Sequence, residues 1–220
     1  MFYEIWFKMD EDLTIVNQNT RNESITSFLK KNLKKIILIL FSLIIFLIFL
    51  FIYQELKERK KNRLAEKYNN IIFDKNISGK SETKDKMIEI VNAKDQTYST
   101  LALYYIIDNK LLDNQIKINE FFDTIISISK NENKFLIVYK KALYNSDKIS
   151  DNEVLAILKP VLNSDSIWKQ HALLLMADIY FQKKQLNKSR DFLNKILDLE
   201  GSNQNLKQEV KKRLNRDFSE

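Results

Sequence analysis

The side chains that could do chemistry are few and lie far apart. His171 is the only histidine and there is no cysteine, which excludes thiol chemistry and a usual zinc site. A lone histidine more often has a structural or surface role. No glycine-rich phosphate loop or nucleophile elbow is present. The carboxylates are scattered, and no pair can be assigned acid and base roles; examples are Asp108, Asp113, Asp123 and Asp178. We therefore predict a protein that is not an enzyme, with no catalytic, metal-binding or cofactor-binding residue.

Aromatic side chains are the other candidates for a functional surface. Tyr104, Tyr105 and Tyr139 could line a concave groove, and Trp168 stands where a helix is expected to begin. Aromatic residues at helical spacing belong more often to a core than to a ligand platform, so we expect Trp168 in the core. The residues of a protein-binding groove are not assigned by the sequence.

An apolar run near the N-terminus predicts a membrane span. Residues 36–53 carry no charge, and as a helix these 18 residues would extend roughly 27 Å, close to the thickness of a bilayer core. In a soluble protein such a helix would need protein on every face, and the rest of the chain is too polar to supply it. A cleaved signal peptide would be shorter and followed by small residues, whereas Gln54, Glu55 and Leu56 come next here. We expect an uncleaved transmembrane helix.

The charges beside this span favour one orientation only weakly. Five basic residues precede it within twenty positions and six come after it. The preceding lysines lie close to the span and are undiluted by acids, and long C-terminal domains translocate largely regardless of charge. We predict a cytoplasmic segment at 1–35 and an exported C-terminal domain. The alternative is a cytoplasmic docking platform with Lys57 to Lys67 on the inner leaflet.

Composition favours helices and argues against nucleic-acid binding. The chain has two glycines and one proline, which predicts few tight turns. Its net charge is +7, but residues 68–200 hold nineteen basic and eighteen acidic groups. The excess lies beside the span, where basic residues ordinarily contact anionic lipid, and in the last twenty residues. We expect no nucleic-acid partner and no small-molecule substrate.

Two segments link the span to the expected helical domain. Residues 54–73 read as a charged helix, and Lys75 to Lys86 reads as a loop because it combines turn residues with charge. The predicted domains are thus a transmembrane helix at 36–53, a juxtamembrane helix and loop at 54–86, and a helical domain at 87–220. The aromatic octet before Met9 differs in composition from the polar residues after it, and we expect Met9 to be the true start.

Apolar and small residues recur in the C-terminal part at spacings that predict pairs of helices. One pair combines an i, i+3, i+4, i+7 stripe with a second helix, and the template fits again 35 residues earlier. Pro160 predicts a bend or an early helix end, and Lys207 to Phe218 a closing helix. The pattern resembles the tetratricopeptide repeat, and predicts an all-α solenoid of about three helix pairs. The copies are Leu173, Met176, Ala177, Tyr180, Leu186, Ser189, Leu193 and Ile196; Ala142, Val154 and Leu158; and, weakly, Leu101, Ala102, Tyr105, Ile118, Phe121 and Ile125.

The layout as a whole resembles a bacterial family, the ancillary subunit of the Sec translocon. The likeness rests on the acidic lead Asp10 to Leu13, the span, the run Tyr98 to Ala102, and Trp168 with Ala172 to Tyr180. The chain departs from the family in its weak first and second repeats and its scarcity of glycine. The resemblance implies a single-span inner-membrane protein with a periplasmic tetratricopeptide-like domain. It also implies partners at the translocon exit, among them periplasmic chaperones or a membrane-anchored peptidyl-prolyl isomerase.

The sequence supports two functional hypotheses. The first is a membrane-anchored, non-enzymatic protein-binding module that assists exported proteins at the Sec translocon. The alternative is an envelope scaffold of similar fold that serves cell division or wall synthesis.

Overall fold

All regular secondary structure in the residues that the structure describes is helical. The computed structural model describes the backbone of residues 2–73 and 79–218, and the side chains of 26–73 and 79–218. The chain divides into two compact units, residues 1–60 and 61–220. Within the described ranges there are nine helices and no strand: α1 (Phe2–Phe73), α2 (Lys80–Asn92), α3 (Tyr98–Asp108), α4 (Gln115–Ile128), α5 (Asn131–Asn145), α6 (Asp151–Leu162), α7 (Lys169–Gln182), α8 (Leu186–Asp198) and α9 (Gln204–Phe218).

Helix α1 contains the predicted apolar run. Every side chain from Ile37 to Tyr53 is exposed. The most apolar window of 18 residues has a mean hydropathy of 3.3, and none of that window is buried. Among the described residues, α1 is the one helix long and apolar enough to cross a membrane. The charged stretch after the run continues the same helix to Phe73, as predicted.

The predicted loop at Lys75 to Lys86 is wrong in its second half, which belongs to α2. Residues 75–78 lie outside the described part of the chain. Gly79, at φ 121°, adopts a backbone conformation that few other residues tolerate, and the helix begins directly after it. Glu82 in the first turn pairs with Lys86 at 2.7 Å, so the charges that resembled a loop support a helix. The buried face of α2 comes next, at Met87, Ile90 and Val91.

The last turns of α1 also belong to the helical unit. Leu64 and Ile71 are buried, and they join one apolar cluster with residues of α2, α3 and α4. The segment expected to be a juxtamembrane helix and loop therefore contributes core residues. The second compact unit begins at Lys61.

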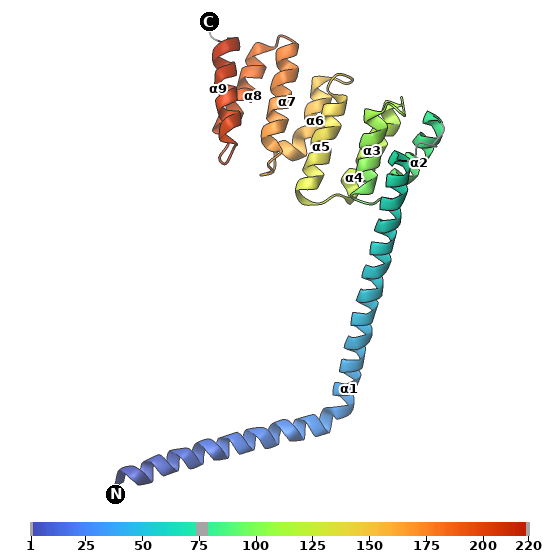
Figure 1. Cartoon of the computed structure of the whole chain (residues 1–220). Coiled ribbons are helices and arrows are strands. Elements are labelled where there is room, and N and C mark those ends of the chain that lie inside the picture. The colour runs from blue at the N-terminus through green and yellow to red at the C-terminus, as the bar shows by residue number, and fades with distance from the viewer. Residues whose placement is uncertain (1, 74–78, 219–220) are drawn as a thin grey trace. The chain divides into compact units, whose positions relative to one another are not determined.

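Helices α2 to α9 follow one another in chain order, each packed against the next (Figure 1). Apart from Leu186, the predicted positions on α7 and α8 are buried, and the Ser189 hydroxyl donates to the Ala177 carbonyl at 2.9 Å. Ala142, Val154 and Leu158 are likewise fully buried between α5 and α6. Small side chains at these positions let the helices of each pair approach closely.

Two members of the predicted apolar stripes are exposed, contrary to expectation. Leu186 is 46% exposed because it is the first residue of α8, beyond the end of α7. Leu101 on α3 is 39% exposed. The weak repeat was predicted as one pair of helices, α3 with α4, but α2 packs against both of these helices. Ser99 of α3 donates to the Ile90 carbonyl of α2 at 2.8 Å, the same type of bond that joins α7 and α8.

Two helix boundaries predicted for the C-terminal part, the end of α6 and the start of α9, lie close to those observed. Pro160 lies inside α6 on its exposed side, and the helix ends two residues later at Leu162. The closing helix is present as α9 and begins three residues before the predicted Lys207. Val210 is its one buried residue, so α9 covers the apolar cluster of α7 and α8 with a narrow stripe.

The two leucines of α8 give a matched test of this packing. We expect Leu193→Ala, at a fully buried position, to lower the free energy of unfolding by about 2–5 kcal/mol. The same change at Leu186 should cost less than about 1 kcal/mol because the side chain is already half in solvent. Urea unfolding of the full chain in detergent, followed by circular dichroism, measures both. Equal losses would show that Leu186 is packed in solution.

Candidate binding surface on α3, α5 and α7

A hollow of about 320 Å³ lies between α3 and α5. Its walls come from the start and middle of α3, from the end of α4 and from the first two turns of α5. The volume lies at the lower end of the range for ligand pockets, about 300–1,000 Å³. The lining residues are Gln96, Thr97, Thr100, Leu101, Tyr104, Ser129, Asn133, Leu136 and Ile137.

Two hydroxyl groups of this hollow are buried without a hydrogen-bond partner. They are Tyr104 Oη and Ser129 Oγ, and no other buried side-chain oxygen or nitrogen in the described residues is unpartnered. Ser129 is only 6% exposed. A buried polar group without a partner costs about 1–3 kcal/mol, so native proteins hold few of them. Both costs fall beside one hollow, and both oxygens lie beneath its surface with no accessible area of their own.

Burial also acts on the ionisation of Tyr104. Desolvation of the phenolate raises the pKa of Tyr104 to about 12 from its ordinary value of 10.0. The side chain is therefore neutral at physiological pH and able both to donate and to accept a hydrogen bond.

The abrupt connection between α4 and α5 places Ser129 in the hollow. Ser129 ends α4 in an extended conformation, and its N–H donates to the Ile125 carbonyl at 3.0 Å. Only Lys130 separates it from α5, and the Lys130 side chain makes no capping hydrogen bond. The first N–H groups of α5 are thus left without a side-chain cap beside Ser129.

A second feature of this surface is an aromatic cluster between α5 and α7. The rings of Tyr139 and Trp168 stack at 5.8 Å between centroids and 24° between planes. The centroid of the His171 ring lies 5.3 Å from that of Trp168 and 6.1 Å from that of Tyr139. All three side chains are partly exposed, so Trp168 contributes to the core of α5–α7 and also reaches the surface. Burial and the nearby Asp178 carboxylate raise the pKa of Tyr139, which keeps this ring neutral as well.

The link before α7 holds Trp168 in place. The Ser166 hydroxyl donates to Glu132 in the first turn of α5 at 2.6 Å, and accepts from the Trp168 N–H at 3.1 Å. Ser166 is buried, so this bond fixes the approach of the chain to α7 against α5.

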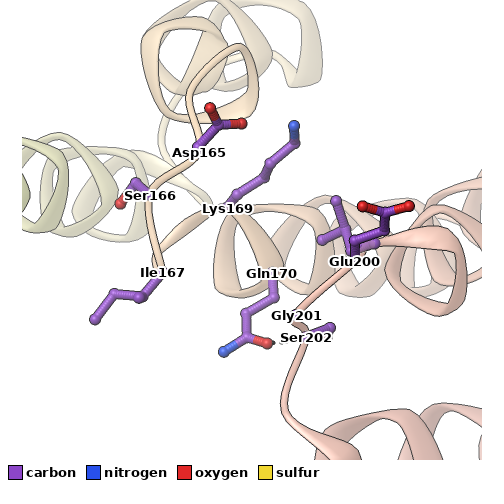
Figure 2. Close-up of a pocket in the computed structure, with 9 residues that line it drawn as sticks. Asp165, Ser166, Ile167, Lys169, Gln170, Glu200, Gly201 and Ser202 are labelled. Atoms are coloured by element: carbon purple, nitrogen blue, oxygen red, sulfur yellow. Dashed lines mark hydrogen bonds between the residues drawn. The ribbon is translucent and has the colours of Figure 1, made fainter.

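A further hollow, of about 270 Å³, lies where α7 begins and α8 ends (Figure 2). Figure 2 shows the Gln170 side chain directed toward Ser202 on the link between α8 and α9. The Gln170 Oε1 accepts from the Ser202 hydroxyl at 3.0 Å and from the Asn203 N–H at 3.1 Å. These polar groups already satisfy one another, and we assign them the structural role of closing the link.

The structure does not bring the scattered carboxylates together. Asp178 pairs with Arg213 of α9 and Asp123 with Lys141 of α5, while Asp108 and Asp113 are exposed. Of the predicted surface residues, Tyr139 and His171 meet in the aromatic cluster and Tyr104 lines the hollow. Ser129 was missed, because nothing in the sequence around it distinguishes it from other serines near helix ends.

Comparisons of the chain with protein-family models, curated proteins and solved structures found no match. The surface is therefore interpreted from its own residues.

Tyr104 gives a test of the burial at this hollow. Because its folded-state pKa of about 12 exceeds the ordinary 10.0, its neutral form stabilises the fold below pH 10, and this contribution is lost as the pH rises toward 12. Tyr104→Phe should remove one late-titrating group from the near-ultraviolet absorbance of tyrosinate, and should weaken the loss of stability between those pH values. Tyr105→Phe is the control. If the difference in tyrosinate absorbance between the wild type and Tyr104→Phe titrates near pH 10, the Tyr104 ring is solvated.

Proposed function

We propose that this chain is a membrane-anchored, non-enzymatic protein-binding module, with a tetratricopeptide-like solenoid after a single transmembrane helix. The observation that carries the binding role is the surface of α3, α5 and α7. Leu101, Tyr139 and Trp168 stay partly exposed there, beside a hollow with two unpartnered hydroxyls. Large apolar and aromatic side chains that stay exposed beside a hollow are typical of binding surfaces.

The solenoid assignment draws its support from two helix pairs. The pairs α5–α6 and α7–α8 bury matching small or apolar residues 35 positions apart, such as Ala142 and Ala177, or Leu158 and Leu193. Helix α9 closes the series with a polar outer face, as the end of a solenoid requires. In this proposal α2, α3 and α4 form an irregular first part, with the hollow where that part meets α5.

We place the protein in a bacterial inner membrane, with residues 1–35 in the cytoplasm and the helical domain in the periplasm. The exposed apolar length of α1 supports the span, and the lysines at 30, 31, 34 and 35 support the orientation. The resemblance in layout to the ancillary Sec subunit supports a role at the translocon exit. There the module would bind exported chains together with periplasmic chaperones. The anchor would raise the local concentration of the domain near such chains.

Topology can be measured with single cysteines, because the natural chain has none. In spheroplasts, we expect a membrane-impermeant maleimide to label Lys140→Cys on exposed α5. Lys31→Cys should be labelled only after lysis, because it lies on the other side of the span. The reverse pattern would place the domain in the cytoplasm and reject the translocon role.

Binding can be tested by photocrosslinking in cells. A photoreactive amino acid at Leu101 or at Lys140, on the proposed surface, should give adducts that contain translocon subunits or exported chains. The control is Asn194, exposed on α8, which should give few adducts. Adducts with division or wall-synthesis proteins instead would favour the envelope scaffold. The binding role would be rejected if positions 101 and 140 gave no more adducts than the control position Asn194.

A further inference from the structure

We propose that α1 carries a binding site for anionic phospholipid headgroups directly before its apolar run. The site is one side of the helix, here called the lysine face, formed by Lys30, Lys31, Lys34 and Lys35. Its partner is the leaflet at the N-terminal end of the span. The inference rests on the membrane span of the proposed function and is independent of the protein-binding role.

The four lysines share one side of α1. Successive residues of an α-helix are about 100° apart, so these four positions fall within a sector of about 140°. All four side chains are exposed. Leu29 and Leu33 lie on the opposite side of the helix and are 43% and 54% exposed. The segment is therefore basic on one side and apolar on the other, as is typical of helices at a membrane surface.

No carboxylate nearby in the sequence balances the lysine face. Residues 24–54 contain these four lysines and no aspartate or glutamate. Two pairs of the lysines stand at i, i+4 spacing on the helix, where like charges repel each other. A negatively charged partner would relieve this repulsion, so the face selects anionic groups over neutral ones.

The basic residues at the other end of the apolar run are partly paired within the chain. Arg59 Nε donates to the Glu55 carboxylate at 2.8 Å. Lys67 forms an ion pair with Glu89 of α2. Residues 54–67 hold six basic and three acidic groups, so an excess of three positive charges is spread over 14 residues, whereas the lysine face carries four within six. The charge that is available to lipid is therefore concentrated at the N-terminal end of the span.

The helical rise places the lysine face at headgroup depth. Lys35 directly precedes Ile36, the first residue of the apolar run, and Lys30 lies about 9 Å before it at 1.5 Å per residue. Helical side chains tilt toward the N-terminus, so these lysines extend away from the hydrocarbon and into the headgroup layer. There an ammonium group can meet a lipid phosphate while it stays hydrated. Lipid is already present at this depth, which favours it over a soluble acidic partner.

The test uses the full chain reconstituted in phosphatidylcholine vesicles with a trace of spin-labelled lipid. Electron paramagnetic resonance measures the fraction of labelled lipid that is immobilised beside the protein. We expect phosphatidylglycerol to be preferred over phosphatidylcholine by about two- to fivefold, as one lysine per headgroup would give. The preference should disappear at about 1 M salt, where charges are screened over about 3 Å. Both leaflets have the same composition, so the result does not depend on the orientation of the chain.

Substitutions on the lysine face test whether its charge is responsible. Changing all four lysines to glutamine should abolish the preference, while phosphatidylcholine is immobilised as before because the apolar run is unchanged. Changing all four to arginine keeps the charge and should keep the preference. These variants are Lys30→Gln, Lys31→Gln, Lys34→Gln and Lys35→Gln together, and Lys30→Arg, Lys31→Arg, Lys34→Arg and Lys35→Arg together.

The matched control removes the same number of positive charges at the other end of the apolar run. It should keep most of the preference, because the lysine face is intact. The control combines Lys57→Gln, Lys60→Gln, Lys61→Gln and Arg63→Gln.

The outcomes separate this inference from the proposed function. Loss of the preference in the glutamine variant, with retention in the arginine variant and the control, supports the lysine face. Equal losses from the two ends of the span, or no preference in the natural chain at low salt, overturn it. A chain that immobilises neither lipid rejects the span and this inference with it. Failure of the photocrosslinking experiment would reject the protein-binding role alone.

Discussion

Each helix of residues 61–218 depends on the next helix in the chain to bury its apolar side chains. Helix α7 shows this constraint most clearly, because seven of its residues are buried. Met176 and Tyr180 belong to the cluster shared with α5 and α6, whereas Leu173 and Ala177 belong to the cluster shared with α8 and α9. Without a neighbour on either side, α7 would expose apolar surface, so the clusters stabilise one another along the chain. The same logic requires a cover at each end. Leu64 and Ile71 of α1 meet this need at one end, and Val210 of α9 meets it at the other.

The hollow lies where this succession is least tight. Helix α2 packs against both α3 and α4, and α5 pairs with α6, so α3 and α5 face each other without packing along their length. Ile137 of α5 still joins the first core cluster, which ties the two parts together at the floor of the hollow. A gap bounded by well-packed helices keeps its shape, because interiors on either side resist compression. The irregular step in the helix series and the candidate site are thus one feature of the fold.

Much of the fold could be predicted from the sequence because it depends on local spacing. The apolar run of α1, the buried positions of α7 and α8, and the closing helix can be inferred from composition and helical period alone. The start of α2 was missed because charged residues and one glycine look alike in a loop and in a first helical turn. The scarcity of glycine was a poor guide to the turns. Lys94, Lys110 and Lys184 take the left-handed conformation after their helices, at roughly 1–2 kcal/mol each, in place of the usual glycine.

The candidate site could be predicted only in part, since it depends on packing between distant segments. The aromatic spacing pointed to Tyr104, Tyr139 and Trp168 as surface or core, and the structure makes each of them partly both. Ser129 became notable only through its surroundings, because its burial depends on α3 and α5 together. No single-sequence pattern encodes a hydroxyl that lacks a partner.

The two unpartnered hydroxyls beside the hollow lower the stability of the fold. An alanine and a phenylalanine in these positions would fill similar space without the cost of about 1–3 kcal/mol for each buried polar group. Since neither oxygen has accessible surface, a ligand could recover that cost only after the side chains around the hollow had moved, and that rearrangement would make its affinity modest. A membrane anchor would compensate for modest affinity by holding the domain close to partners at the same membrane. In the proposed function, the apolar span would set where the protein acts, and the exposed side chains of α3, α5 and α7 would set what it binds.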